Sequence, residues 1–413
     1  MRQSVHSEQK FRTLVELIRC ADVAYTNLET TLHNFQGYPS ARWAGPYLCS
    51  NPIMIEELKW MGFNLFSCAN NHATDYSEGG LLATMATLDQ ARVTYAGIGI
   101  NLEAARSPAY LETKKGRVAL ISAASETFGR AGPARKDMQG RPGFNPLRFD
   151  VHYVVDGKTI ASLKKIADDL GLLKVYSEPS EYYFLDNRFV EGTNLGIHSA
   201  THKVDAQGNL ESIRKARFQS DWILFAHHCH PGRSGRNDQI PAEFMEDFAH
   251  KCINEGVNAF IAHGYHALRG IEIYKGRPIF YGLGNFIEQS DTVEKQPAEF
   301  YEYLGLDPYL ALPSDIIEDN AKEVSGRRPA EWSYEKKSQW ESAVACMRFK
   351  GDRVQELTLH PISLGYDLPK SQRGRPTLAD KPLANKILSK LRELSKIYDT
   401  RIDVRDGIGK IRL

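Results

Sequence analysis

The sequence predicts an α/β fold in which mixed β-sheets are covered by helices on their outer sides. Strand-like and helix-like segments alternate in the first hundred residues and again from residue 222, and three β-hairpins accompany them. Alternation of this kind builds parallel sheets, whereas hairpins add antiparallel strands to the same layers.

Residue spacing predicts the elements of the N-terminal part in order. Apolar residues three and four positions apart predict a helix over 8–20. Asn51 and Pro52 suit the start of a second helix, and Gly62 suits its end. The other predicted elements here are strands at 23–27, 63–69 and 93–96, a helix at 78–91, and a hairpin joining 110–113 to 117–122.

The same alternation resumes in the second half of the chain. It predicts strands at 222–228 and 258–262, a helix at 241–255, hairpins joining 271–274 to 278–283 and 343–349 to 353–360, and a helix at 379–397 before a basic tail. Segments 130–220 and 290–340 interrupt this pattern. We interpret residues 1–413 as one domain with these two insertions, and we expect the first, with a charged helix at 158–171, to cover the active site.

Composition excludes several classes of protein. The 413 residues are 42% hydrophobic and 25% charged with a net charge of +1, which is ordinary for a soluble globular protein without a nucleic-acid partner. No apolar run is long enough to predict a membrane segment, and the N-terminus lacks the apolar core of a signal peptide. The six cysteines include no Cys-x-x-Cys pair, which favours free thiols. If Met1 is the true start, we expect a cytoplasmic protein with a small-molecule or peptide substrate.

Four polar clusters directly follow four of the predicted strands. They are Asn27-Leu28-Glu29, Asn70-Asn71-His72, His227-His228-Cys229-His230 and His263-Gly264-Tyr265-His266. Because ligands bind outside the carboxyl ends of strands in open α/β sheets, we expect the clusters to converge on one site. Six of the thirteen histidines lie in them, and imidazole, carboxylate and amide groups together suit Zn, Mn or Fe. A single strand-end histidine is more often structural, so the prediction depends on the coincidence of four clusters.

Further candidate side chains lie near these clusters. Asp75 follows His72 by three residues and can orient it as a general acid, although a helix N-cap explains Asp75 equally well. Asn285 ends a hairpin strand and can line the pocket. Arginine pairs bidentately with carboxylate or phosphate, so candidates for substrate binding are Arg141, Arg148 and Arg269, although each taken alone more often has a surface role.

Taken in order, the motifs of this chain resemble those of the CapA family of bacterial capsule-synthesis and poly-γ-glutamate proteins. The matching stretches are 21–29 (ADVAYTNLE), 69–76 (ANNHATDY), 79–84 (GGLLAT), 96–99 (AGIG), 263–266 (HGYH) and 279–286 (IFYGLGNF). The resemblance covers about residues 10–125 and 220–290, and less clearly the C-terminal hairpin.

The family is similar to the calcineurin-like metallophosphoesterases, so the resemblance implies a four-layer α/β/β/α sandwich with a two-metal site. It implies that Glu29 bridges the metals, that Asn71, His228 and His263 complete the second metal, and that His266 binds the first while His72 protonates the leaving group. With the candidates above, the predicted catalytic residues are His72, Asp75 and His228, the substrate-binding residues are Arg141, Arg148, Arg269 and Asn285, and the metal ligands are Glu29, Asn71, His228, His263 and His266.

One motif of the family pattern has no counterpart in the sequence. The pattern opens with a strand ending in Gly-Asp, which supplies an aspartate to the first metal, and nothing before residue 10 can form it. Either the start lies upstream of Met1 or the element is lost. Because the first metal then keeps only Glu29 and His266, we expect at most one well-held divalent ion (Mn, Fe or Zn), and a metal-free site is the alternative.

Three functions are compatible with this site. The resemblance favours a metal-dependent hydrolase that uses a metal-bound water to cleave an amide bond, for example a γ-glutamyl bond, or a phosphoester bond. The second is a metal-independent peptide epimerase, because histidine and carboxylate groups freed from a metal form an acid–base pair. The third is a non-catalytic accessory protein of capsule or polymer synthesis.

Overall fold

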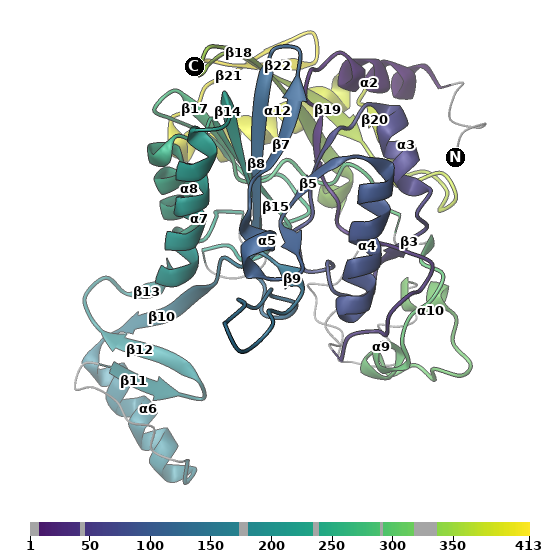
Figure 1. The fold of residues 1–413 in the computed structure, drawn as a ribbon. Helices are drawn as coiled ribbons and strands as arrows, with labels where there is room; N and C mark the ends of the chain where they lie inside the picture. Colours follow the sequence, from purple (N-terminus) through teal and green to yellow (C-terminus); the bar gives the residue numbers. More distant parts are fainter. Residues whose placement is uncertain (1–7, 42–45, 173–180, 234–238, 290–291, 318–336) are drawn as a thin grey trace.

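Two β-layers lie face to face at the centre of the protein, and helices cover both outer sides (Figure 1). The structure is a computed structural model that describes residues 8–41, 46–172, 181–233, 239–289, 292–317 and 337–413. Each β-layer packs its inner face against the other and its outer face against helices. The predicted four-layer α/β/β/α arrangement with mixed sheets is therefore confirmed.

The first β-layer contains a three-stranded parallel sheet in the order β1-β4-β5. Its strands are β1 (Tyr25–Asn27), β4 (Leu65–Ser67) and β5 (Thr94–Ala96), and its outer helices are α2 (Gln9–Arg19), α3 (Met54–Met61) and α4 (Ser77–Ala91). The buried face of α2 carries Phe11, Leu14 and Ile18, at the spacing that predicted this helix. Gly62 ends α3 with a φ of 110°, a left-handed conformation that glycine adopts without a Cβ clash.

The second β-layer is a six-stranded mixed sheet in the order β16-β17-β15-β14-β8-β7. The strands are β7 (Ala109–Thr113), β8 (Gly116–Ala124), β14 (Trp222–His228), β15 (Ala259–His263), β16 (Ile271–Tyr274) and β17 (Arg277–Phe280). The four central strands run parallel, and hairpins add β7 and β16 at the edges. Helices α7 (Lys203–Arg217) and α8 (Glu243–Glu255) cover its outer side.

Alternating side chains join the two β-layers. In β4, Leu65 belongs to the core between the sheets, together with Leu120 of β8 and Leu224 of β14. The next residue, Phe66, belongs to the core under the outer helices. This alternation is what a strand buried on both faces requires.

The C-terminal part forms an antiparallel sheet in the order β18-β19-β22-β21, with a short strand β20 on β19. Its elements are β18 (Glu341–Lys350), β19 (Arg353–Ser363), β20 (Thr377–Leu378), β21 (Ile402–Arg405) and β22 (Ile408–Ile411), with helix α12 (Lys381–Ser395) and the 3-10 helices η3 (Lys337–Trp340) and η4 (Lys396–Tyr398). The expectation of a plain basic tail is wrong for residues 402–411. They form a hairpin because Ile402 and Ile411 pack into the same core as Leu388 of α12.

An arm of the chain projects away from the sandwich (Figure 1). It consists of β10 (Phe149–Val155), α6 (Gly157–Asp169), β11 (Glu181–Phe184), β12 (Asn187–Glu191) and β13 (Gly196–Thr201), with the strands in the order β11-β12-β10-β13. The helix was predicted, but none of the four strands of the arm was. Among the described residues between 130 and 220, none lines the large cavity of the protein. The expectation that this segment covers the site is therefore wrong.

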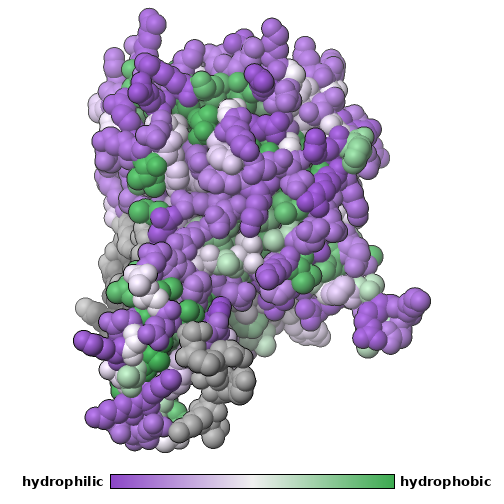
Figure 2. Space-filling model, turned by 90° about the vertical axis from the view of Figure 1, so that its left-hand side faces the viewer, coloured by the Kyte–Doolittle hydropathy of each residue, from purple (hydrophilic) through white to green (hydrophobic). Residues whose placement is uncertain are grey.

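Short elements complete the described fold: β2 (Thr31–Leu32), β3 (Cys49–Ser50), β6 (Ile98–Gly99), β9 (Gly143–Phe144), α5 (Leu102–Arg106), α9 (Ala298–Tyr303) and α10 (Pro313–Ile317). Within the described ranges, every helix is too short or too polar to cross a membrane. The face that carries α7, α8 and the arm is largely hydrophilic, with apolar residues scattered across it (Figure 2).

Candidate metal centre

The carboxyl ends of β1, β4, β14 and β15 meet at one large cavity. Asn27 pairs with Ser67 at the end of the first sheet, and His228 pairs with His263 at the end of the second. Ser67 Oγ lies 3.4 Å from His263 Nε2, which brings these two ends into contact. The cavity has a volume of about 1730 Å³, and residues of all four polar clusters line it, namely Asn27, Glu29, Asn71, His72, His230, His263 and His266.

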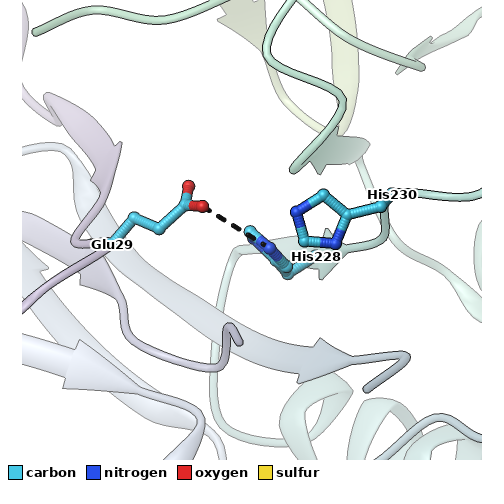
Figure 3. Close-up of side chains that lie close together, drawn as sticks. All are labelled: Glu29, His228 and His230. Atoms are coloured by element: carbon cyan, nitrogen blue, oxygen red, sulfur yellow. Dashed lines mark ion pairs between the residues drawn. The ribbon is translucent and has the colours of Figure 1, made fainter. Parts of the chain in front are cut away.

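Glu29, His228 and His230 form a compact group beside this cavity (Figure 3). Each offers one ligand atom, and these atoms lie within 4.8 Å of one another. Glu29 follows β1 and points its carboxylate toward His228, the last residue of β14, while His230 follows on the same segment. Glu29 Oε1 lies 3.7 Å from His228 Nε2. Both atoms are buried without a hydrogen-bond partner among the described residues.

Two imidazoles of the site are held through their Nδ1 atoms. His230 Nδ1 donates to Glu126 Oε1 at 2.7 Å, and His266 Nδ1 donates to Asn285 Oδ1 at 2.9 Å. The direction follows because a carboxylate or amide oxygen only accepts. Contacts of this kind at Nδ1 leave Nε2 to face a metal, which is how proteins hold histidines that bind one.

His228 makes a third contact of this kind. Its Nδ1 lies 2.9 Å from Nδ1 of His263, and when His228 donates in this pair its Nε2 presents a lone pair toward Glu29. Burial lowers the pKa of His228 well below its ordinary value, and the neighbouring imidazoles lower it further. The ring is therefore neutral, as a metal ligand must be.

His263 lies behind His228 and outside the group of three. Its Nδ1 lies 2.9 Å from Nδ1 of His228, and its Nε2 lies 3.4 Å from Ser67 Oγ. Burial lowers the pKa of His263 to about 3, so this ring is also neutral. In the described structure both ring nitrogens of His263 lie near other side chains, those of His228 and Ser67, and its role as a metal ligand stays a prediction.

His266 approaches Glu29 from a second direction. Its Nε2 lies 3.5 Å from Glu29 Oε1, the same oxygen that faces His228. The backbone of His266 has a φ of +61°, a left-handed conformation that is costly for a residue with a Cβ. Strained positions of this kind cluster at functional sites, and the ring of His266 lies beside the Glu29 carboxylate.

His72 lies at the cavity wall with its ring held by Asp75. His72 Nδ1 donates to Asp75 Oδ2 at 2.7 Å, and the same oxygen accepts from the backbone N–H of Leu48 at 2.7 Å. The helix α4 has Tyr76 at its N-cap position and no side-chain cap. Of the two interpretations of Asp75, the structure therefore favours contact with His72. Asn71, the preceding residue, also lines the cavity.

Two of the candidate arginines are engaged away from the cavity. Arg148 donates to the buried carboxylate of Asp205 from Nε at 2.6 Å and from Nη2 at 2.8 Å. Arg141 donates twice to the backbone carbonyl of Arg130. Neither lines the cavity in the described part of the chain. The structure thus does not bring these predicted substrate-binding residues to the site, because other parts of the fold use their guanidinium groups.

The third arginine supports the site from behind. Arg269 is fully buried, and its guanidinium stacks on the ring of Tyr265 at 3.9 Å. Its Nη2 donates to the backbone carbonyl of His230 at 3.1 Å. Arg269 therefore holds the segment that carries His230, while the fourth predicted substrate-binding residue, Asn285, does line the cavity.

His230 and Glu126 belong to the site although the sequence interpretation assigned them no role. The one sequence signal for His230 was its place in the polar cluster after β14. Glu126 follows β8, and the pairing of Ala124 with His228 brings the ends of β8 and β14 together. No local pattern marks Glu126, because its contact with His230 depends on this pairing.

Fold and site together define a class of protein: an α/β/β/α sandwich whose strand ends carry one carboxylate and several imidazoles. This set of donors fits Zn, Mn or Fe, whereas Ca and Mg prefer oxygen ligands alone. The orphaned Glu29 Oε1 and His228 Nε2 are consistent with such an ion, since a cation between them would satisfy both.

The chain belongs to the family described as bacterial capsule synthesis protein PGA_cap, which it matches over residues 1–290. It is 36% identical over 412 residues to the uncharacterized protein y4sH of Sinorhizobium fredii, covering 98% of this chain and 88% of that protein. Capsule biosynthesis protein CapA of Bacillus anthracis is 22% identical over 351 residues, which cover 84% of this chain and 70% of that protein. A Mycobacterium tuberculosis protein named "Probable polyglutamine synthesis accessory protein" is 26% identical over 279 residues, which cover 66% of this chain and 57% of that protein. The resemblance found in the motifs is therefore confirmed.

Proposed function

We propose that this protein is a metal-dependent hydrolase that cleaves an amide bond of the γ-glutamyl type during polymer synthesis. The observation that carries the proposal is the common anchoring of His228, His230 and His266. Each ring has a contact at Nδ1. Nε2 of His228 and Nε2 of His266 lie 3.7 Å and 3.5 Å from Glu29 Oε1, and His230 offers a ligand atom beside Glu29 and His228. Arrangements of this kind hold metal ligands in the correct tautomer and orientation.

The proposed chemistry divides between the ion and His72. A divalent ion, when bound, supplies Lewis acidity and a water of lowered pKa. Glu29, His228 and His230 would hold it. His72 donates a proton from Nε2 to the departing amine, while Asp75 keeps Nδ1 protonated and the ring in place.

The choice of an amide over a phosphoester is supported in two ways. Relatives of this chain bear the names of capsule biosynthesis and polyglutamine synthesis proteins. In addition, Arg141, Arg148 and Arg269 do not line the cavity in the described part of the chain, and Arg269 is fully buried behind it, which speaks against a phosphate held by these three candidates. The cavity wall instead offers the amides of Asn71 and Asn285.

The direct test is a hydrolysis assay on the full chain with γ-glutamyl oligomers and, in parallel, an aryl phosphate. After treatment with a chelator, we expect release of glutamate only when Mn, Zn or Fe is restored. His228→Ala should abolish the activity, whereas His198→Ala, in the arm, should not. Release of phosphate alone would make the protein a phosphoesterase instead.

Two other outcomes distinguish the competing functions. Incorporation of solvent deuterium at the α-carbon of a glutamyl substrate, unaffected by chelator, would identify an epimerase. Normal polymer synthesis in cells that carry both His72→Ala and His228→Ala would identify an accessory protein without turnover. Either result contradicts the proposed hydrolysis.

A further inference from the structure

His227, the next-to-last residue of β14, points away from the candidate metal centre. Its ring lies in the core under α8, with ring centroids 6.0 Å from Phe244 and 6.0 Å from Phe260. The next residue, His228, faces the metal centre, as the alternation of side chains along a strand requires. His227 is fully buried, and burial lowers its pKa to about 3 against an opposing effect of the Glu126 charge. The ring is therefore neutral.

The contact between His227 and Ser125 defines the tautomer of this ring. His227 Nε2 lies 2.8 Å from Ser125 Oγ, and the same oxygen lies 2.6 Å from the backbone carbonyl oxygen of Leu147. A carbonyl oxygen only accepts, so the single hydroxyl hydrogen of Ser125 goes to Leu147. Ser125 Oγ therefore accepts from Nε2–H of His227, and Nδ1 of the neutral ring carries no hydrogen.

Nδ1 of His227 is buried without a hydrogen-bond partner among the described residues. A buried acceptor of this kind carries a desolvation cost that nothing offsets, and an apolar ring such as phenylalanine would avoid it. The aromatic surroundings suit an apolar ring equally well. The hydrogen bond to Ser125 is thus the feature that distinguishes His227 from an apolar residue at this position.

Ser125 lies where β8 ends and a loop of the metal centre begins. Its backbone N–H donates to the carbonyl of His228 at 2.9 Å, which continues the pairing of β8 with β14 by one residue. The next residue is Glu126, whose Oε1 lies 2.7 Å from His230 Nδ1. Residues 127 and 128 of the loop are exposed. Ser125 is therefore the last residue of the sheet before the carboxylate that contacts His230.

The side chain of Ser125 joins two parts of the fold. On one side it contacts His227 in β14, and on the other it contacts the segment 145–147. This segment lies beside the end of β8, because Ala124 N donates to the carbonyl of Asn145 at 2.9 Å and Leu147 N donates to the carbonyl of Ala124 at 2.8 Å. Both side-chain contacts fix the rotamer of Ser125 and the direction in which the chain leaves the strand.

We propose that His227 is a positioning residue of the metal centre, which through Ser125 fixes the place of Glu126 and so the orientation of the His230 ring. The hydrogen bond to Ser125 has this effect, and the aromatic packing of the ring does not. The inference rests on the proposed metal centre and deepens it, because a residue that does not line the cavity then determines metal affinity. It does not depend on which bond the protein cleaves.

The first test is isothermal titration of Zn or Mn into variants of the full chain. His227→Phe keeps an aromatic ring in the core but has no donor for Ser125, so metal affinity should fall by about tenfold. His227→Gln carries an amide N–H that can reach the Ser125 hydroxyl, and it should restore most of the affinity. The matched control is His250→Phe, which changes an imidazole of α8 paired with Glu272 and should bind metal as the wild type does.

The second test needs no metal. In the metal-free chain with ¹⁵N-labelled histidine, at alkaline pH, His230 should show its hydrogen on Nδ1, because Glu126 accepts it. In His227→Phe the spectrum should show a mixture of both His230 tautomers. Ser125→Ala removes the same hydrogen bond from the other side, so it should give the same mixture, and the double variant should bind metal no more weakly than either single variant.

Unchanged metal affinity or an unchanged His230 tautomer in His227→Phe would overturn the proposal. A His227→Gln variant as weak as His227→Phe would overturn it as well. If thermal unfolding shows that His227→Phe does not fold, Ser125→Ala replaces it in both tests, with the same expected losses and the same contradicting results. A wild type that binds no metal would refute the proposed function, whereas the tautomer of His230 would still decide whether His227 positions this ring.

Discussion

His228 Nε2 lies 3.7 Å from Glu29 Oε1, and neither atom has a hydrogen-bond partner in the described part of the chain. A buried polar atom without a partner costs about 1–3 kcal/mol, so this arrangement requires an explanation. A proton on His228 is disfavoured, because burial and neighbouring imidazoles lower its pKa. The divalent cation that we propose for this site would satisfy both atoms.

Metal binding should therefore stabilise the folded chain. At a free concentration 100 times the dissociation constant, Mn or Zn should add about 2.7 kcal/mol to the free energy of unfolding. His228→Ala should remove this gain, whereas His198→Ala, which changes an imidazole paired with Glu243 in the arm, should retain it. Thermal unfolding with and without metal measures the difference. Equal stabilisation of wild type and His228→Ala would show that the ion binds elsewhere.

The contact between Glu126 and His230 predicts that Glu126 affects metal affinity indirectly, through the orientation of His230. Glu126→Gln should weaken metal affinity by about 10–100-fold, because the carboxylate orients His230 and fixes its tautomer. Isothermal titration with Zn or Mn measures this change. The control is Glu112→Gln, an exposed carboxylate paired with Arg117, which should bind metal as the wild type does. Unchanged affinity in Glu126→Gln would remove His230 from the metal centre.

The pair of His72 and Asp75 predicts a loss of rate without a loss of metal. His72→Ala should lower kcat by about 10²–10⁴-fold, the range typical of a general acid. Asp75→Asn keeps an acceptor oxygen for His72 and Leu48 but removes the negative charge, so a smaller loss of about tenfold is expected. Steady-state kinetics combined with metal titration separates the two effects. Loss of metal from either variant would contradict this assignment.

The ion pair of Arg148 and Asp205 predicts a role in stability. Removing Arg148 leaves a buried carboxylate without its main partner. Arg148→Met should cost about 2 kcal/mol, less than the roughly 3–5 kcal/mol of a fully buried pair, because the Arg148 side chain is 39% exposed. Arg135→Met, at an exposed pair with Asp137, should change stability by no more than about 0.5 kcal/mol. Denaturant unfolding gives both values.

The same pair predicts a pH dependence. Burial raises the pKa of Asp205, but the hydrogen bonds from Arg148 outweigh burial and hold the pKa below its usual value. Its contribution to stability is therefore present above about pH 4 and is lost as the pH falls below that value, because the unfolded chain binds the proton first. In Arg148→Met this loss should disappear. An unchanged pH profile would assign the acid sensitivity to other carboxylates.

The sandwich itself was predictable because its elements are long and patterned. The buried residues of α2 and α8 recur at helical spacing, and β8 and β14 are apolar runs. Local sequence was therefore sufficient to predict these helices and strands. The arm was not predictable in detail. Its strands have few buried side chains, and Ile197 in β13 is exposed, so no alternation marks them.

The sequence predicted which strand-end residues come together at the site, but not which side chains hold them. Glu29 and His266 follow strands and His228 ends one, and the rule that strand ends carry ligands placed them together. The contact of His230 with Glu126, and the capture of Arg148 by Asp205, join residues 104 and 57 positions apart. Contacts of this range depend on the packed fold, and a single sequence contains no signal for them.

The arm leaves and rejoins the sandwich at adjacent points, since the backbone N–H of His202 donates to the carbonyl of Arg148 at 2.8 Å. Two ends this close can be bridged by a short turn. An ancestral protein could therefore have gained the arm, or a descendant could lose it, through one event between neighbouring codons without displacing β8, β14 or the site. Closely related chains are then expected to differ most in length at this position, and a shortened chain of this kind should still fold.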